Sequence, residues 1–196
     1  MSDGTAGLEP HEIALLRGGP RAAVTVALVA LHLRGVVEPG RPGTVRAVPW
    51  DAAVSRLSSP WEDVVHSELE KPLRPRRLTR RPYVRLGVSL IRVRLAEEGL
   101  LRWPFLGPTR AARRDLAALR ERHPLPARRQ GLTDHDKLLA VALHGEAALR
   151  VLVPRFAYRT GLLPGAGVAD PGSPGSSWGY GGGAHGCGGG CGGGSD

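Results

Sequence analysis

Apolar residues recur at helical spacing through most of this chain, in segments that begin near a proline or polar cap and end near a glycine. The segment over residues 20–35 is apolar almost all round, which is typical of a helix at the centre of a soluble core. The pattern predicts a mainly α-helical domain. Its helices are expected over residues 8–19, 20–35, 59–70, 82–98, 109–123, 133–145 and 145–161, with Pro154 ending or kinking the last.

Two segments with proline and glycine between short apolar runs predict β structure. Residues 36–48 predict a hairpin, and residues 100–108, too short and proline-interrupted for a helix, predict a strand or wing. Each segment follows a helix that ends at a glycine, so Gly35 aligns with Gly99. Two interpretations stay open: a diverged winged-helix repeat, or two unrelated core helices with ordinary glycine caps.

Polar residues at the start of the helix over residues 59–70 suggest a local cap. Ser59 and Glu62 stand three residues apart, which is the spacing of a capping box. Glu62, His66 and Glu70 are spaced by four and share one helix face. Because one such stripe supplies too few ligands for a metal without a partner helix, we interpret it as a solvated face.

Acidic residues and histidines also gather near the start of a later helix. Asp134 and Asp136 follow Thr133, where carboxylates face the positive end of the helix dipole, so we interpret them as first-turn acids behind a cap. His135 and His144 are nine residues apart and therefore lie on opposite faces of a helix. No nucleophile elbow, phosphate-binding loop, zinc-protease motif or dinucleotide fingerprint occurs, and we expect a protein that is not an enzyme.

Positive charge is concentrated in the middle of the chain. The net charge is +9, from 27 basic and 18 acidic residues, and only Lys71 and Lys137 are lysines. Residues 71–129 hold 17 of the basic residues and 4 of the acidic ones. The planar guanidinium group suits phosphate because it can bind two oxygens, so this block predicts an anion-binding surface, with codon bias on a solvated surface as the alternative. The candidate anion-binding residues are Arg81, Arg85, Arg92, Arg113 and Arg114.

An arginine block of this kind fits an anionic lipid surface, an acidic protein or nucleic acid. The longest apolar run, residues 22–31, is shorter than the ~20 residues of a bilayer span, and its extension to Leu33 is interrupted by His32. With no basic signal segment at the N-terminus, we expect a cytoplasmic protein that associates peripherally with an anionic membrane or an acidic partner. The alternative is a winged-helix nucleic-acid-binding protein that uses the helix over residues 82–98 as its reader.

The C-terminal part of the chain has no helical periodicity, and residues 165–196 include 15 glycines. Because so few apolar side chains cannot offset the entropy of ordering the backbone, we predict a helical globular domain over residues 1–163 and a disordered Gly/Cys-rich tail over residues 164–196. Thiolate and imidazole groups bind zinc, and the candidate ligands are His185, Cys187 and Cys191. Metal binding or assembly through this tail is a third hypothesis, and no other cofactor is expected.

Several motifs resemble an uncharacterised actinobacterial domain family. The matching stretches, within residues 8–163, are LEPHEIALLRGGPRAAV, ALHLRGVV and LTDHDKLLAVALHGEAAL, and a Gly/Cys tail follows them. Members of that family often end in such tails, and some are labelled membrane proteins. The resemblance implies no known activity.

The order of motifs is more distantly similar to the Golgi phosphoprotein family and its bacterial relatives. The corresponding pieces are LRG at Leu33–Gly35, LAEEGLL at Leu95–Leu101 and DKLLAVALHGEAAL at Asp136–Leu149. This resemblance implies a mostly helical fold and the binding of a phosphoinositide head group through arginines and a tryptophan. Arg85 aligns with one of those arginines, Val88 stands at its partner's position, and no tryptophan matches.

Overall fold

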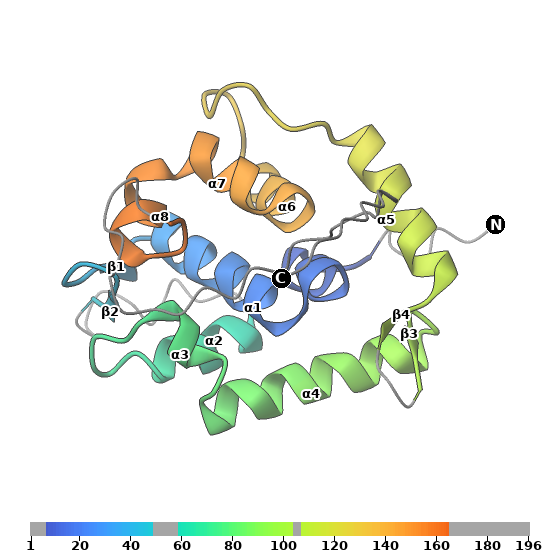
Figure 1. Ribbon diagram of the computed structural model, residues 1–196, viewed down its shortest axis with the longest axis horizontal. Helices are drawn as coiled ribbons and strands as arrows, with labels where there is room; N and C mark the ends of the chain where they lie inside the picture. Colours follow the sequence, from blue (N-terminus) through green and yellow to red (C-terminus); the bar gives the residue numbers. More distant parts are fainter. Residues whose placement is uncertain (1–6, 49–58, 104–106, 165–196) are drawn as a thin grey trace, which may run out of the picture. The chain divides into compact units, whose positions relative to one another are not determined.

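The computed structural model describes residues 7–48, 59–103 and 107–164, and Figure 1 shows their arrangement. Eight helices lie in these residues: α1 (Pro10–Leu33), α2 (Pro60–Ser67), α3 (Pro75–Leu78), α4 (Pro82–Glu97), α5 (Arg110–Arg122), α6 (Asp134–His144), α7 (Glu146–Leu152) and α8 (Pro154–Thr160). Two antiparallel hairpins pair β1 (Val37–Pro39) with β2 (Val45–Ala47), and β3 (Leu101–Arg102) with β4 (Gly107–Pro108). The prediction of a mainly α-helical domain with short hairpins is confirmed. Residues 165–196 of the predicted tail lie outside the described residues.

Helix α1 forms the centre of the core. It is kinked at Gly19, whose φ of 71° and ψ of −164° are not helical, immediately before Pro20. The two helices predicted over residues 8–35 are therefore two halves of one kinked helix. Helix α1 packs against α2, α5 and α6, and Figure 1 shows it in blue between α6 and α2. All six residues of α6 from Leu138 to Leu143 are buried.

By length and composition alone, α1 could also cross a membrane, because its most apolar window has a mean hydropathy of 1.4. However, 67% of that window is buried inside the fold. Leu28 and Val29, for example, are both 0% exposed and belong to the hydrophobic core. In the described residues, α1 is therefore packed as a core helix.

The two helix-to-hairpin junctions have the same local geometry. Gly35 and Gly99 both have positive φ, at 75° and 72°, which a glycine adopts without strain. After the first, the Val36 amide donates to the Leu31 carbonyl at 3.0 Å; after the second, the corresponding amide of Leu100 donates to Leu95 at 2.8 Å. A hydrogen bond from an amide just beyond the helix to the carbonyl five residues earlier is characteristic of the Schellman motif, which ends many helices. The alignment of Gly35 with Gly99 therefore pairs residues that end a helix and begin a hairpin in the same way.

Local caps were predicted correctly at two helices and wrongly at one. The Thr109 hydroxyl accepts from the Ala112 amide, and Thr133 forms a reciprocal capping box with Asp136. The predicted box at α2 is wrong because the Ser59 side chain makes no capping hydrogen bond. The carboxylate of Glu62 instead pairs with Arg34 at the end of α1. An ion pair with another helix therefore takes the place of the predicted capping hydrogen bonds.

The prediction of a solvated stripe on α2 is also wrong. Glu62 and His66 are only 6% and 5% exposed, because α2 turns this face toward α1. Glu70 lies beyond the end of α2 at Ser67 and is exposed, so it does not extend the stripe. Spacing alone cannot distinguish a polar face in water from one that meets an arginine of another helix.

Candidate functional site

Helix α4 has apolar side chains on two opposite faces. Val84, Val88 and Leu95 are 0%, 4% and 0% exposed and pack into the core. The opposite face is a row of large apolar side chains in water, which we call the α4 stripe: Tyr83, Leu86, Leu90 and Val93, with exposed fractions of 68%, 57%, 63% and 42%. Their spacing of three, four and three residues places them along one side of the helix. Soluble proteins seldom leave such a contiguous row exposed without a binding role.

The core side of α4 is held closely against α2. A Cβ atom built on Gly87 would lie 2.9 Å from the Trp61 ring, closer than real contacts allow. The absence of a side chain at Gly87 therefore lets the ring, which is 4% exposed, lie directly against the backbone of α4. Near the other end of α4, Arg94 reaches back to Glu12 of α1 at 2.7 Å. The α4 stripe is thus presented by a helix fixed at two points.

Two arginines lie on the flank of α4 between its core face and the α4 stripe. Arg85 and Arg92 are seven residues apart, which is two helical turns, so they lie along the same edge of α4. Neither forms an ion pair with a described residue. Arg81, the residue before α4, pairs with Glu68 at 3.4 Å and is partly neutralised there. Of the predicted anion-binding residues, Arg85 and Arg92 are therefore the two best placed beside the stripe.

Aromatic side chains lie at both ends of this surface. Tyr83 is in the first turn of α4, and Trp103, which is 64% exposed, follows β3 after the helix has ended. Figure 1 shows the β3–β4 hairpin at the C-terminal end of α4. The sequence analysis did not single out the α4 stripe. The signal was present, because residues 83, 86, 90 and 93 have helical spacing alongside the core positions 84, 88, 91 and 95.

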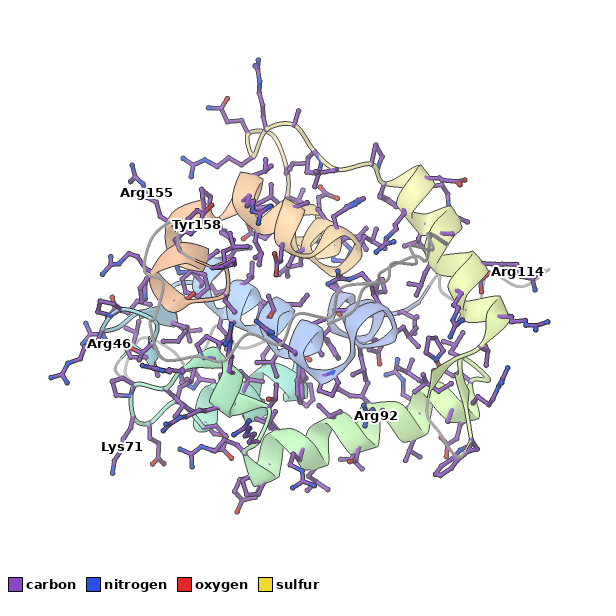
Figure 2. All side chains as sticks on the ribbon, in the orientation of Figure 1. Arg46, Lys71, Arg92, Arg114, Arg155 and Tyr158 are labelled. Carbon is purple, nitrogen blue, oxygen red and sulfur yellow. The ribbon has the colours of Figure 1, made fainter. Side chains whose placement is uncertain are left out.

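The structure does not bring the five predicted arginines into one site. Arg113 and Arg114 are on α5, a different helix from Arg85 and Arg92. Arg113 lines two surface cavities, whereas Arg114 is exposed on the outer side of α5 (Figure 2). Other cations are spread further: Figure 2 labels Arg46 on β2, Lys71 after α2 and Arg155 on α8. The predicted anion-binding arginines therefore differ in which helix carries them and in whether they lie near exposed apolar side chains.

Ionisable groups do meet in a cavity of about 350 Å³ between α1, α2 and α6. His11, Trp61, Glu62, Asp134 and His135 are among its lining residues. Burial, with a smaller effect of the Arg94 charge, lowers the pKa of His11 to about 4, so this imidazole is neutral at pH 7. Glu62, Asp134 and His135 were predicted as separate local features, and His11 was not singled out from the sequence.

No metal site is visible in the part of the chain that the structure describes, where no three His, Cys, Asp or Glu side chains gather around one point. The candidate zinc ligands His185, Cys187 and Cys191 lie outside the described residues, and metal binding by the tail stays a prediction.

A cavity of about 540 Å³ opens beside α8. His32 stacks on Phe156 in its lining, with ring centroids 3.9 Å apart and 8° between the planes. Burial lowers the pKa of His32, which keeps this imidazole neutral for stacking. Its cationic lining includes Lys137, whose charge is already paired with Asp134 at 2.9 Å. Arg129 and Arg155 also line this cavity.

Comparison with family models, with curated proteins and with solved structures found no match for this chain. The resemblances to the actinobacterial domain family and to the Golgi phosphoproteins accordingly stay predictions.

Proposed function

We propose that this protein binds peripherally to anionic membranes from the cytoplasmic side, without catalysing a reaction, and that α4 is the element that contacts the bilayer. The observation that carries the proposal is the α4 stripe, a row of four exposed apolar side chains on a helix whose other face is packed in the core. An interfacial helix has this distribution, with its apolar side at the boundary between head groups and acyl chains.

Burial of the stripe supplies the main favourable term. Complete transfer of a leucine side chain out of water contributes roughly 1.5–3 kcal/mol, and Leu86 and Leu90, which are 57% and 63% exposed, can each supply part of that amount. Tyr83 and Trp103 have the amphipathic rings that are enriched at the head-group level of bilayers. Because α4 is already folded and fixed to α1 and α2, binding requires little ordering of the chain.

Arg85 and Arg92 make the surface selective for anionic lipid. Each arginine near such a membrane contributes about 1 kcal/mol, and its long side chain can place the guanidinium among phosphates while α4 lies deeper. Salt screens this term but not the apolar one. The proposal therefore predicts binding that is weakened, but not abolished, by salt.

The alternative function, nucleic-acid binding, has one observation in its favour. The element order α2, α3, α4 and the β3–β4 hairpin is that of three helices followed by a wing, with α4 in the place of the reader. Base edges in the major groove are read by hydrogen-bonding side chains. The exposed large apolar side chains of α4 include Leu86 and Leu90, and leucine offers no hydrogen bond. The apolar stripe thus favours lipid over bases.

The proposal is tested by co-sedimentation of the full chain with phosphatidylcholine vesicles that contain or lack phosphatidylglycerol. Replacing both Leu86 and Leu90 by serine should weaken binding to the anionic vesicles by more than about tenfold, because two apolar side chains are lost from the buried surface. Tyr158→Ser on α8 is the matched control, since Tyr158 is also exposed, at 45%, but lies on another element (Figure 2), and it should bind as the unchanged protein does.

A second pair of variants tests the charge. Arg85→Gln with Arg92→Gln should reduce the preference for anionic vesicles and flatten the dependence on salt, whereas Arg114→Gln on α5 should change neither. Equal effects of these changes would contradict a localised site. Duplex DNA is added as a competitor: displacement of the protein from vesicles by DNA, or sedimentation with DNA that survives the leucine changes, would favour the alternative function.

A further inference from the structure

A second arginine site lies away from the α4 stripe, in a cavity of about 440 Å³ where α5 faces α1 and the end of α6. Arg17, Arg113 and Arg120 line it, and no aspartate or glutamate does. Leu16, Leu116 and Leu143 supply an apolar wall. Three guanidinium groups therefore line one cavity whose lining contains no acidic side chain, and Glu146 lines a separate cavity with Arg17.

Arg17 forms no ion pair with a described residue. Its Nε atom is buried and has no hydrogen-bond partner among the described residues. The guanidinium lies directly over Gly145, where an added Cβ would come within 2.4 Å of one terminal nitrogen. Burial, and then the like charge of Arg120, lower the pKa of Arg17. A buried donor beside a second cation is a costly arrangement that a bound anion would relieve.

Arg120 is held in position from the opposite side. Its Nε donates to the Leu143 carbonyl at 2.9 Å, in the last turn of α6. This bond uses one donor and leaves the two terminal nitrogens without a hydrogen bond or ion pair to any described residue. A guanidinium anchored at Nε presents a preoriented pair of donors, which is the geometry that binds two oxygens of one phosphate.

A neighbouring cavity of about 320 Å³ continues the same basic surface. Arg102, Arg110 and Arg113 line it, again with no acidic side chain, and Arg113 and Pro108 are common to both cavities. Arg113 therefore stands where the two cavities meet. The combined surface presents five arginines around a partly apolar hollow.

We propose that this surface binds a phosphate monoester with an apolar body, the phosphate between Arg17, Arg113 and Arg120 and the body against Leu16, Leu116 and Leu143. A carboxylate brings one negative charge, whereas a phosphate monoester brings nearly two and three acceptor oxygens, which is the better match for three guanidinium groups. The site shares no residue with the α4 stripe and does not depend on the proposed membrane function.

Calorimetric titration of the full chain tests the site, with n-octyl phosphate below its critical micelle concentration as the probe. Octyl phosphate should bind at least ~tenfold more tightly than inorganic phosphate, because the alkyl chain adds apolar contact. Arg113→Gln should weaken binding of octyl phosphate by about tenfold or more through loss of a charge-assisted contact. Arg114→Gln, one residue along α5 but outside both cavities, should leave it unchanged.

Arg17→Gln provides an independent test on α1, with thermal unfolding as a check that the chain still folds. Arg113 is exposed, so its variant keeps the proposal testable even if the change at Arg17 prevents folding. Octyl phosphate that binds no more tightly than inorganic phosphate, or that is lost equally in the Arg113 and Arg114 variants, would overturn the site.

Such a ligand can be a soluble metabolite or a membrane lipid, and vesicles distinguish these sources. Phosphatidic acid carries a phosphate monoester and phosphatidylglycerol a diester. If the ligand is a lipid, Arg113→Gln should weaken binding to phosphatidic acid vesicles and spare binding to phosphatidylglycerol vesicles. If the ligand is soluble, Arg113→Gln should weaken octyl phosphate binding alone. If Arg113→Gln weakens binding to both kinds of vesicle but leaves octyl phosphate binding unchanged, Arg113 contributes only to the general positive charge of the surface, and the proposed site is contradicted.

Discussion

At the scale of single residues, the acidic groups inside this protein are held by arginines from other elements. Glu12 is 1% exposed, accepts from the Glu9 amide at 2.9 Å and pairs with Arg94 of α4 at 2.7 Å. Burial raises the pKa of Glu12, and the Glu9 amide and the Arg94 charge oppose that rise. Arg94 thus belongs to the core side of α4 although it lies within the arginine-rich block.

Loss of Arg94 should leave the Glu12 carboxylate buried without its cation. We expect Arg94→Met to reduce the free energy of unfolding by about 1–3 kcal/mol, below the range for fully buried pairs because the Arg94 side chain is half exposed. Urea denaturation at neutral pH measures this. Arg92→Met, two residues away and without an ion pair to a described residue, should change stability by less than about 0.5 kcal/mol. Similar losses in both variants would contradict the role given to Arg94.

His11 should make the fold sensitive to acid. Its pKa is about 4 in the folded protein against 6.5 for the free side chain, mainly because it is buried, and it stacks on Trp61. Between these two values the unfolded chain holds the proton and the folded one does not, so stability is complete above about pH 6.5 and falls as the pH drops toward 4.

Replacement of His11 by glutamine should remove roughly 2–3 kcal/mol of that fall, while His32 and His66, whose pKa values are also lowered by burial, keep their share. Urea midpoints at a series of pH values measure the difference. A His11→Gln curve parallel to that of the unchanged protein would show that His11 titrates as an exposed histidine.

At the scale of elements, α4 is the point where fold and proposed function meet. One face depends on the close approach of Trp61 to Gly87, and the other carries the α4 stripe. Glycine inside a helix normally costs about 1 kcal/mol relative to alanine. At Gly87 this cost is offset by packing, because a side chain there would overlap the Trp61 ring.

Gly87→Ala should therefore destabilise the protein despite the better helix propensity of alanine. We expect a net loss of about 1–2 kcal/mol, because overpacking against a rigid aromatic ring exceeds the gain in propensity. Ser89→Ala on the exposed side of α4 is the control and should lie within about 0.5 kcal/mol of the unchanged protein. A stabilised Gly87→Ala variant would mean that Trp61 can move aside at little cost.

Elements were predictable from the sequence wherever their signals are local. Proline in the first turn, threonine caps and glycine endings mark most helix limits, and the structure places α5 and α6 after Thr109 and Thr133 as predicted. The short helix α3 was not predicted, because its four residues lie in a basic connector with no periodicity to detect. At α2 the local capping signal failed because the Glu62 side chain is used by Arg34 instead.

At the scale of the whole molecule, α1 is the element on which the others pack, and its burial separates it from the surface helix α4. Val29 of α1 is 0% exposed, whereas Leu90 of α4 is 63% exposed. Val29→Asp should lower the free energy of unfolding by more than about 3 kcal/mol, since it buries a carboxylate without a partner. Leu90→Asp should leave it nearly unchanged.

Thermal unfolding in detergent-free buffer measures the stability of the Val29→Asp and Leu90→Asp variants. If α1 crossed a membrane and took no part in the soluble core, Val29→Asp would leave the unfolding of the remaining helices unaltered. The opposite ranking, with Leu90→Asp the more damaging change, would mean that the α4 stripe is covered by another part of the protein.

Features that depend on neighbours along the chain were predictable from the residues alone: a helical fold, a core helix over residues 20–35, β structure after Gly35 and Gly99, and arginines concentrated in one block. These follow from propensity, periodicity and capping, which act within a few residues. Which arginines form ion pairs, and which apolar face of α4 meets water, became evident only from the three-dimensional packing. Both depend on the packing of α1, α2 and α4, because ion pairs such as Glu12 with Arg94 join residues far apart in the sequence.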